Sequence, residues 1–549
     1  MTHHLVRYAV AAAITAAAAG AANATSLSQY AANQAAGLNV NVYISGSTAV
    51  DNTIASELQT ASLNICQSGT VTAYTDANKV LDASNNPIGG AKEYIYYCQA
   101  GVSSGVATTK FLAVFKESTA GSIHGAQPLI QVAKGQSSGL TFLNPTGPDV
   151  QAGTCGNAGS GGTDAGCTAA DFLQNVVPTG GVADVEANLL RTVPGGGSLS
   201  TSDISTYLAG APGLDVVWGV AVTKNLFYAL QVAEHLTDGT VAGCSTTGND
   251  SPACAPSLSK EQVASLLLGA NNNNGNLLTW NQITGLNNAT DNNVYICRRD
   301  VGSGTEASFE AYFLGARCSS SDEAMATQDG QFVIESASTG NVLKCLQAFD
   351  AGGISITPYN QDFGTTYPPF TPTGGQWAIG IMSTELKSTD LSTHGDDIRM
   401  VAVDGVLPTL ANVVNGYYPY FSTDAWYTVK SGQNIPSGDP LAAFKAIQGD
   451  IGHPIPTQAA DANYQNRPWG SGGDLAPASL FATSANAGYT TFPVTTTEVE
   501  GNPINLFTKA SNGSVNNCDT PVLYGNIGSG LAQQTSPEGV LLGSKFVNQ

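Results

Sequence analysis

This sequence has little charge, and positive charge is the scarcer kind. Asp and Glu number 41 against 20 Lys and Arg, so the formal net charge is −21, and only 11 % of the chain is charged. An acidic surface repels nucleic acid and anionic lipid headgroups, so we expect neither as a partner. It also repels small anions at long range. Any anion site must therefore depend on local geometry, and salt should screen the opposing field.

Histidine is scarce as well, and closely spaced cysteines are absent. The chain has 6 His, which are scattered, and no Cys-x-x-Cys motif. This pattern argues against a structural or catalytic metal, so we expect no metal and no cofactor. We also expect no catalytic residue, because no nucleophile flanked by a base is apparent.

The 10 cysteines instead indicate disulfides, which are typical of exported proteins. Two predicted pairs bracket short loops rich in small residues, and a third is more widely spaced. The predicted pairs are Cys155–Cys167, Cys244–Cys254 and Cys66–Cys98. The pairing of Cys297, Cys318, Cys345 and Cys518 stays open at this point.

The first 24 residues, MTHHLVRYAVAAAITAAAAGAANA, predict a cleavable signal peptide. An arginine precedes an Ala-rich apolar run, and small residues end it, with the expected cut after Ala24. The run is too short and too rich in alanine for a membrane span, and no later segment is apolar enough. We therefore expect a soluble exported protein, periplasmic or secreted.

Apolar runs alternate with helix-like segments along the chain. Strands are expected at 40–44, 111–115, 214–222, 293–297 and 376–382, and helices at 223–236 and 260–269. This alternation favours an α/β fold with mostly parallel sheets flanked by helices. Long loops rich in Gly, Ser, Asn and Pro separate these segments and indicate insertions on a scaffold.

Three small-residue turns share one design, in which a strand ends, hydroxyl residues follow and a helix begins. They are SGST at 45–48, STAGS at 118–122 and GSGT at 302–305. Small side chains let a ligand approach the backbone, and the first N–H groups of a helix lack partners within it. Ser and Thr are also ordinary helix caps, so one such turn would indicate little. Three in order, with Arg299 before the last, predict an oxyanion site.

Further motifs give the chain a resemblance to the periplasmic phosphate-binding protein family, the soluble receptors of phosphate ABC transporters. The similarity spans roughly residues 40–430 and keeps the family's order. The matching segments are ISGSTA at 44–49, STAGSIHG at 118–125, GVAD at 181–184, LLLG at 266–269, TWNQITGLN at 279–287, RDVGSGT at 299–305, WAIGIM at 377–382 and NGYYPYF at 415–421.

The resemblance implies a two-lobe, periplasmic-binding-protein-like (type II) fold with a ligand between the lobes. After the signal peptide at 1–24, the first lobe would comprise 25–222 and 386–549, and the second 223–385. Both lobes would grip the ligand, which favours the closed form. The implied ligand is inorganic phosphate or a similar oxyanion, and an ABC permease is a possible partner.

The family's ligand roles carry over to nine residues of this chain. Donors would come from hydroxyls, from the N–H of Ala49 and from the turn at 303–305, while one arginine would pair with the ion and one aspartate would accept. The residues are Ser47, Thr48, Ala49, Ser122, Asp184, Arg299, Ser303, Gly304 and Thr305.

Asp184 is the residue that would set the choice of ligand. A protonated phosphate has an O–H to donate to its carboxylate, whereas sulfate near neutral pH has none. A buried acceptor without a donor costs enough free energy to discriminate strongly.

The chain departs from the family in several places, and these leave alternatives open. Where the family has an aspartate two residues after the arginine, this chain has Val301, and Asp300 comes one residue early. Arg298 is the alternative ligand arginine, and Glu186 the alternative acceptor. Ala49 stands where the family often has phenylalanine, which implies a looser pocket wall.

Other interpretations of the same residues remain. Asp184 would also suit a helix cap, and Arg299 a structural ion pair. We expect Trp218, Trp280 and Trp377 in the core and His124 on a surface loop, and we attribute the G-x-S-x-G match at 135–139 to chance.

The sequence therefore predicts an exported protein that binds phosphate for ABC-type uptake. The alternative is a secreted or cell-surface protein of the same fold, with another oxyanion ligand or a non-transport role. A phosphatase-like enzyme is the third possibility.

Overall fold

A computed structural model describes most of the chain. The described residues are 27–75, 93–118, 121–146, 173–190, 199–244, 246, 248–269, 278–288, 290–318, 325–326, 329–360, 366–385, 398–451, 469–478, 489, 493–510 and 514–523. The predicted signal peptide and the predicted pair Cys155–Cys167 lie outside these residues.

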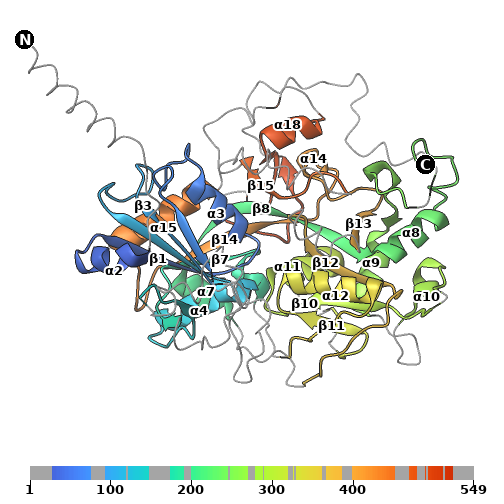
Figure 1. The fold of residues 1–549 in the computed structure, drawn as a ribbon, viewed down its shortest axis with the longest axis horizontal. Coiled ribbons are helices and arrows are strands. Elements are labelled where there is room, and N and C mark those ends of the chain that lie inside the picture. Colours follow the sequence, from blue (N-terminus) through green and yellow to red (C-terminus); the bar gives the residue numbers. More distant parts are fainter. Residues whose placement is uncertain are drawn as a thin grey trace, which may run out of the picture.

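The first lobe is built on a sheet with strands in the order β7-β1-β4-β3-β2 (Figure 1). Its strands are β1 (Asn39–Gly46), β2 (Thr72–Thr75), β3 (Glu93–Gln99), β4 (Phe111–Glu117) and β7 (Gly180–Ala183). β1 pairs in parallel with β4 and β7, while β3 is antiparallel to β4 and β2. The strands expected at 40–44 and 111–115 are thus confirmed as β1 and β4.

The second lobe is built on three parallel strands in the order β11-β10-β12. They are β10 (Tyr295–Arg299), β11 (Val333–Ser336) and β12 (Ala378–Ser383). β10 and β12 match the strands expected near 293–297 and 376–382, and all their residues are buried. Such fully buried strands are typical of parallel sheets covered on both faces.

Two long strands join the lobes into one connected sheet. β8 (Leu208–Thr223) pairs antiparallel with β14 (Phe421–Val429) over its first part and with β12 near its end. Figure 1 shows β8 running from one lobe to the other. β13 (Ile398–Val403) pairs with the end of β8 and with β9 (Ser257–Leu258). The lobe boundaries expected at 222 and 385 stay predictions.

The remaining strands are short and lie off the main path of the large sheet. They are β5 (Thr141–Leu143), β6 (Leu173–Asn175), β15 (Asp474–Pro477), β16 (Ile504–Asn505), β17 (Phe507–Thr508) and β18 (Val522–Leu523). Of these, β15 begins with the buried residue Asp474 and pairs antiparallel with β8 at Val216 and Asp215.

Helices cover both lobes. Those associated with the first lobe and the segments that close it are α2 (Leu27–Ala35), α3 (Asp51–Gln59), η1 (Gly121–Gly125), α4 (Gln127–Ala133), η2 (Ala187–Leu190), α7 (Thr201–Tyr207), α14 (Leu410–Val414), α15 (Gly438–Ile451) and α18 (Thr496–Gly501). Those of the second lobe are α8 (Lys224–Ala233), η3 (Pro252–Cys254), α9 (Lys260–Leu268), α10 (Trp280–Thr284), α11 (Gly304–Phe309), η4 (Glu310–Leu314) and α12 (Thr339–Ala351).

The helix expected at 260–269 shows how local chemistry sets its bounds. Ser259 caps α9 and forms a reciprocal pair with Gln262, and Gly269 ends it with φ of 61°. Val263, Leu266 and Leu267 face the core. Together with the strands, these elements confirm the α/β fold class, with helices covering the two lobes of one connected sheet.

Four disulfides lie within the described residues, and two of them confirm predictions. Cys66–Cys98 and Cys244–Cys254 are the predicted pairs, and Cys297–Cys345 and Cys318–Cys518 resolve the pairs left open. Cys297 lies on β10 and Cys345 on α12, so that bridge ties a strand to its covering helix. Cys318–Cys518 joins residues 200 positions apart.

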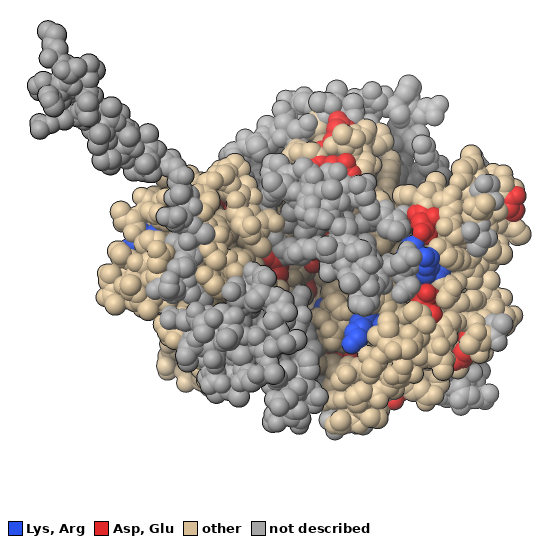
Figure 2. Space-filling model, in the orientation of Figure 1, with Lys and Arg blue, Asp and Glu red and all other residues tan. Residues whose placement is uncertain are grey.

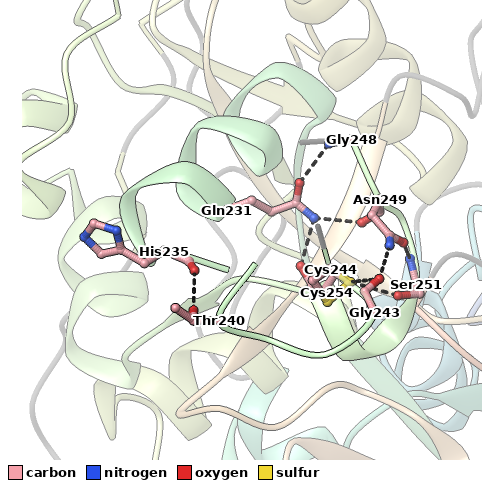
Figure 3. The surroundings of a disulfide bond; sticks show 9 residues. All are labelled: Gln231, His235, Thr240, Gly243, Cys244, Gly248, Asn249, Ser251 and Cys254. Atoms are coloured by element: carbon pink, nitrogen blue, oxygen red, sulfur yellow. Dashed lines mark hydrogen bonds between the residues drawn. A yellow bond between two sulfur atoms is a disulfide. The ribbon is translucent and has the colours of Figure 1, made fainter. Parts of the chain in front are cut away.

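The loop closed by Cys244–Cys254 is packed against α8 through one side chain (Figure 3). The amide nitrogen of Gln231 donates to the carbonyls of Asn249 and Cys254, both at 2.8 Å. The side-chain oxygen of Gln231 accepts from the N–H of Gly248 at 3.2 Å. This loop is therefore a locally stapled insertion, as its spacing predicted.

Much of the described surface visible in Figure 2 is uncharged, as the composition requires. The same view shows acidic side chains at the junction between the left-hand and right-hand parts of the molecule. Within the described residues, no helix is long and apolar enough to span a membrane.

Candidate functional site

Two of the predicted turns and the GVAD segment meet at one edge of the first-lobe sheet. Ser47 follows β1, Ser122 lies in η1, and Asp184 follows β7. The hydroxyl of Ser47 donates to the Asp184 carboxylate, and the Asp184 N–H donates to Ser122 Oγ at 3.0 Å. β1 and β7 are parallel, with Gly46 opposite Val182, so their carboxyl ends lie side by side. Three segments far apart in sequence thus surround one carboxylate.

Small residues make this convergence possible. Gly46 has φ of 108°, and a Cβ there would lie 2.7 Å from the Cα of Gly125. Such a φ favours glycine, and that space is already filled by backbone. The glycines of SGST and SIHG therefore let β1, η1 and β7 pack backbone against backbone.

The turn of the second lobe docks directly on this cluster. Ser303 caps α11, and its Oγ accepts from the N–H of Thr305 at 3.2 Å. A Cβ on Gly304 would contact Ser122 Oγ and would lie 2.7 Å from Asp184 Oδ2. The Ile123 N–H donates to the Gly302 carbonyl at 2.9 Å. The structure thus brings together Ser47, Ser122, Asp184, Ser303 and Gly304.

Arg299 lies beside the same contact and is almost fully buried, with 2 % of its surface exposed. Its Nη2 donates to Asp300 Oδ1 at 3.3 Å and to the Ala337 carbonyl at 3.2 Å. The same atom would lie 3.4 Å from a Cβ on Gly121, next to Ser122. Its Nε has no hydrogen-bond partner among the described residues. Asp300, one residue before the position where the resembled family has its aspartate, therefore supplies the carboxylate that holds the Arg299 guanidinium, which Val301 cannot do.

Arg298, the alternative ligand arginine, points into the second lobe instead. Its guanidinium forms a buried ion pair with Glu306. Its Nε donates to the Arg299 carbonyl at 3.1 Å and its Nη1 to the Ala326 carbonyl at 2.7 Å. Strand alternation turns the two neighbours to opposite faces of β10. The geometry favours Arg299 as the arginine next to the cluster.

The other predicted residues lie at the site but serve local contacts. The N–H of Ala49, expected to bind a ligand oxygen, donates to Ser47 Oγ at 3.0 Å. Thr48 is half-buried, and its carbonyl accepts from the Asp51 N–H at 3.3 Å. Thr305 is buried. The N–H groups of Ala49 and Thr305 would have to exchange partners to reach a ligand.

Glu186, the alternative acceptor, is already engaged away from the cluster. The backbone N–H of Asn517 donates to both of its carboxylate oxygens at 3.1 Å. The side-chain amide of Asn517 donates to Oε2 at 2.7 Å. Asp184, in contrast, faces the second-lobe turn, so it is the better placed acceptor.

The surroundings of Asp184 have two opposing effects on the pKa of its carboxyl group. Burial raises the pKa of its carboxyl above the ordinary value, and it is 4 % exposed. Hydrogen bonds from Ser47 and Ser122 and the charges of Arg299 and Lys116 oppose that rise. A carboxyl in this balance can accept a hydrogen bond or hold a proton, depending on its neighbours.

Lys116 is a functional candidate that the sequence analysis did not name. It is fully buried at the end of β4, and its Nζ donates to the Gly46 carbonyl at 2.9 Å and to Ser118 Oγ at 2.7 Å. It also pairs with Asp51 at 3.2 Å. The sequence did offer one signal, because Lys116 directly follows the apolar run FLAVF of the predicted strand. A lysine at the end of a buried strand is rarely buried itself unless it has a partner.

Two more carboxylates near Asp184 were also missed. Asp424 lies on β14 and Asp474 at the start of β15, and both are buried. Their charges, with that of Asp184, act on one another. Asp424 follows the segment NGYYPYF at 415–421, and Asp474 lies in the C-terminal part of the chain; the sequence analysis singled out neither residue.

The remaining candidates have structural positions. Trp218, Trp280 and Trp377 are core residues, as expected. His124 is half-buried, and its Nδ1 lies 3.1 Å from a carboxylate oxygen of Glu117. Within the described residues, no group of three or more His, Cys, Asp or Glu side chains is arranged to hold a metal ion.

Comparisons with known proteins give only distant likenesses. No protein-family model matches the chain, and no curated protein matches it. A putative phosphate ABC transporter substrate-binding protein from Clostridium perfringens, solved with bound phosphate, is 13 % identical with a TM-score of 0.34, over 75 % of this chain and 96 % of that one. PstS from Borrelia burgdorferi is 12 % identical with a TM-score of 0.29, over 75 % and 95 %.

An ABC-type phosphate transport receptor from Vibrio cholerae is 13 % identical with a TM-score of 0.26, over 50 % of this chain and 74 % of that one. Likenesses this low do not establish membership of a family. The function must therefore be inferred from the residues of the site.

Proposed function

We propose that this protein is an exported solute-binding protein that captures inorganic phosphate between its lobes, for ABC-type uptake. The observation that carries this proposal is the contact of Gly304, in the second lobe, with Asp184 and Ser122 in the first. Hydroxyls, a buried guanidinium and one carboxylate meet there. Together they match a tetrahedral ion that has both charged oxygens and an O–H group.

Each group has a role that fits phosphate better than sulfate. Arg299, whose Nε has no hydrogen-bond partner among the described residues, would pair with the charged oxygens. Ser122 and Ser303 would donate to the others, and Ser47 would join them by exchanging its bond to Asp184 for one to the ion. Asp184 would accept the proton of the ion. A sulfate ion would bring no donor to Asp184 and would leave a buried charge unpaired, which is costly.

Binding requires the two lobes to separate and close again. Gly304 leaves no room for a side-chain atom beside Asp184, so an oxyanion has to enter by moving α11 away from the first lobe. Because groups from both lobes contact the ion, its binding would stabilise one closed arrangement over open ones.

Export is the part of the proposal that rests on the disulfides. Four bridges lie within the described residues, and disulfides persist in oxidising compartments. The Ala-rich leader predicted from the sequence agrees with this. A secreted role without a transporter would use the same binding site.

Titration calorimetry with phosphate, arsenate and sulfate tests the binding function. We expect heat from phosphate and arsenate and little from sulfate, and we expect Arg299→Ala to abolish it. Lys110→Ala is the matched control, because it removes one positive charge from a first-lobe surface pair with Asp439. Equal binding of sulfate would favour another oxyanion, and no heat with any ion would overturn the proposal. Hydrolysis of p-nitrophenyl phosphate, lost on changing one residue, would favour an enzyme instead.

A further inference from the structure

A second buried carboxylate, Asp424, lies near Asp184, whose charge acts on it. β14 runs antiparallel to β7, with Ala425 opposite Ala183 and Trp426 opposite Val182. Asp424 and Asp184 are the next residues beyond this pairing, one on each strand. The charge of Asp184 acts on Asp424, so the two carboxyl groups lie near one another. We therefore place Asp424 within reach of an ion that contacts Asp184.

Asp424 lies at an irregularity of β14, and one oxygen of its carboxylate accepts no hydrogen bond from the described residues. The register between β14 and β8 shifts between Thr423 and Ala425, which places Asp424 at the irregularity. Bulges of this kind often re-aim a side chain beside a binding site. Asp424 is fully buried, its Oδ2 accepts weakly from Trp426 Nε1 at 3.4 Å, and its Oδ1 has no partner among the described residues. A buried carboxylate oxygen without a donor is costly unless a ligand supplies one.

A third buried carboxylate, Asp474, lies near Asp184 and Asp424. Asp474 is buried, its Oδ2 accepts from Thr53 Oγ1 at 3.1 Å, and its Oδ1 also lacks a partner among the described residues. The charged and titratable groups facing Asp424 and Asp184 are Asp474 on β15, Asp215 on β8, Arg299 on β10 and Lys116 on β4. Negative groups thus outnumber positive ones around an anion site.

An anion can bind beside this excess of carboxylates only if protons are present, either on the ion or on the carboxylates themselves. Among the described residues, no group of three or more such side chains is arranged to hold a metal ion. Burial, followed by the charges of Asp184, Asp474 and Asp215, raises the pKa of Asp424 well above its ordinary value. A bound anion with two O–H groups would give each of two carboxylates a donor.

We propose that Asp424 is a second specificity-determining acceptor, so that the site takes the singly charged, doubly protonated form of phosphate or arsenate. This inference rests on the proposed phosphate function. One O–H of the ion donates to Asp184 and the other to Asp424. The two unprotonated oxygens face Arg299 and the serine hydroxyls. Doubly charged phosphate and sulfate lack the second donor and are rejected.

The pH dependence of binding tests the proposal. We expect calorimetry of the full chain with inorganic phosphate to show affinity falling roughly tenfold or more from about pH 5.5 to about pH 8.5, as the ion loses its second proton. In Asp424→Asn the amide can donate to the deprotonated oxygen, so the fall should shrink to about threefold or less. Asp439→Asn, at a surface ion pair with Lys110, is the matched control and should keep the wild-type slope.

A measurement on the unaltered protein keeps the test decisive if Asp424→Asn does not fold. Phosphite near pH 5.5 is a tetrahedral monoanion with one O–H and one P–H, so it offers a single donor. We expect it to bind at least about tenfold more weakly than phosphate, the effect of one lost bond to a charged group. Equal affinity for the two ions, or the same pH slope in wild type and Asp424→Asn, would overturn this inference alone. If wild type bound no phosphate at any pH, the proposed function would fall first.

Discussion

Gly304 lies directly against Asp184, so that a Cβ on residue 304 would stand 2.5 Å from the Cβ of Asp184. The two residues belong to different lobes: Asp184 follows β7 in the first, and Gly304 begins α11 in the second. Their contact is where the oxyanion site is proposed, and only a glycine permits it. The following predictions test this contact, the residues around it and the framework that supports it.

Gly304→Ala is expected to hold the lobes apart. The added methyl would meet Ser122 Oγ and Asp184, so the closed form is disfavoured, and phosphate affinity should fall by roughly tenfold or more, since 1.4 kcal/mol corresponds to a factor of 10. Small-angle scattering should give a larger radius of gyration. Gly340→Ala is the control, because it also lies at the start of a Ser-capped helix but meets only Ser338 Oγ, at 3.8 Å. Unchanged affinity in Gly304→Ala would contradict the proposed site.

Asp184→Asn should weaken phosphate binding and relax the rejection of sulfate. The amide offers donors where the ion has an O–H, and removing the buried negative charge removes the penalty for sulfate. We expect the preference for phosphate to shrink by roughly tenfold or more, as for one hydrogen bond to a charged group. Competition calorimetry measures this. Glu186→Gln should leave the preference unchanged, because Asn517 already holds that carboxylate; a change there would make Glu186 the acceptor.

Arg298→Ala should destabilise the protein, because it leaves Glu306 buried without its partner. Burial raises the pKa of Glu306 to about 8 even with Arg298 present. Breaking a buried ion pair costs about 3–5 kcal/mol, which urea unfolding would detect. Replacing both partners, as Arg298→Met with Glu306→Gln, should recover much of that loss. Loss of phosphate binding at full stability would mean that Arg298 is the ligand arginine.

The Cys318–Cys518 bridge should be a main stabiliser of the assembled fold. Cys318 follows η4 in the second lobe, and Asn517 beside Cys518 is bound to Glu186 and to the Thr423 carbonyl. Changing both cysteines to serine should lower the free energy of unfolding by about 2–5 kcal/mol. The same change at Cys244 and Cys254, separated by 10 positions, should cost less, since the loop it closes is shorter. Equal losses would show that the long bridge adds nothing by its span.

Asp215 should make stability depend on pH. Burial raises the pKa of Asp215 to about 7 from its ordinary 3.8, against hydrogen bonds from Thr423 and Asn505. The folded state therefore binds more protons than the unfolded state between these values, so this contribution is full below pH 3.8 and is lost as the pH rises to about 7. Urea midpoints from about pH 4 to pH 8 should fall less steeply in Asp215→Asn than in wild type. Parallel curves for the two proteins would refute the assignment.

The sequence by itself determined the local elements of this protein. The continuous apolar run at 111–115 became β4, which is almost wholly buried, and the alternation of valine with polar residues at 39–42 became β1, where these valines are buried. Ser259 and Gly269 set the ends of α9, and short spacing brought Cys244 to Cys254. The small residues of the turns at 45–48 and 302–305 were visible too, since only such residues allow close backbone approach.

Only the tertiary structure decided which of these groups meet. Arg298 and Arg299 look alike in the sequence, and the packing of β10 between β11 and β12 chose which of them faces the first lobe. Asp424 comes near Asp184 because β14 pairs with β7 up to Ala425 and Ala183, residues 242 positions apart in the sequence. Such contacts depend on burial and strand pairing between distant segments, and no local pattern of residues encodes them.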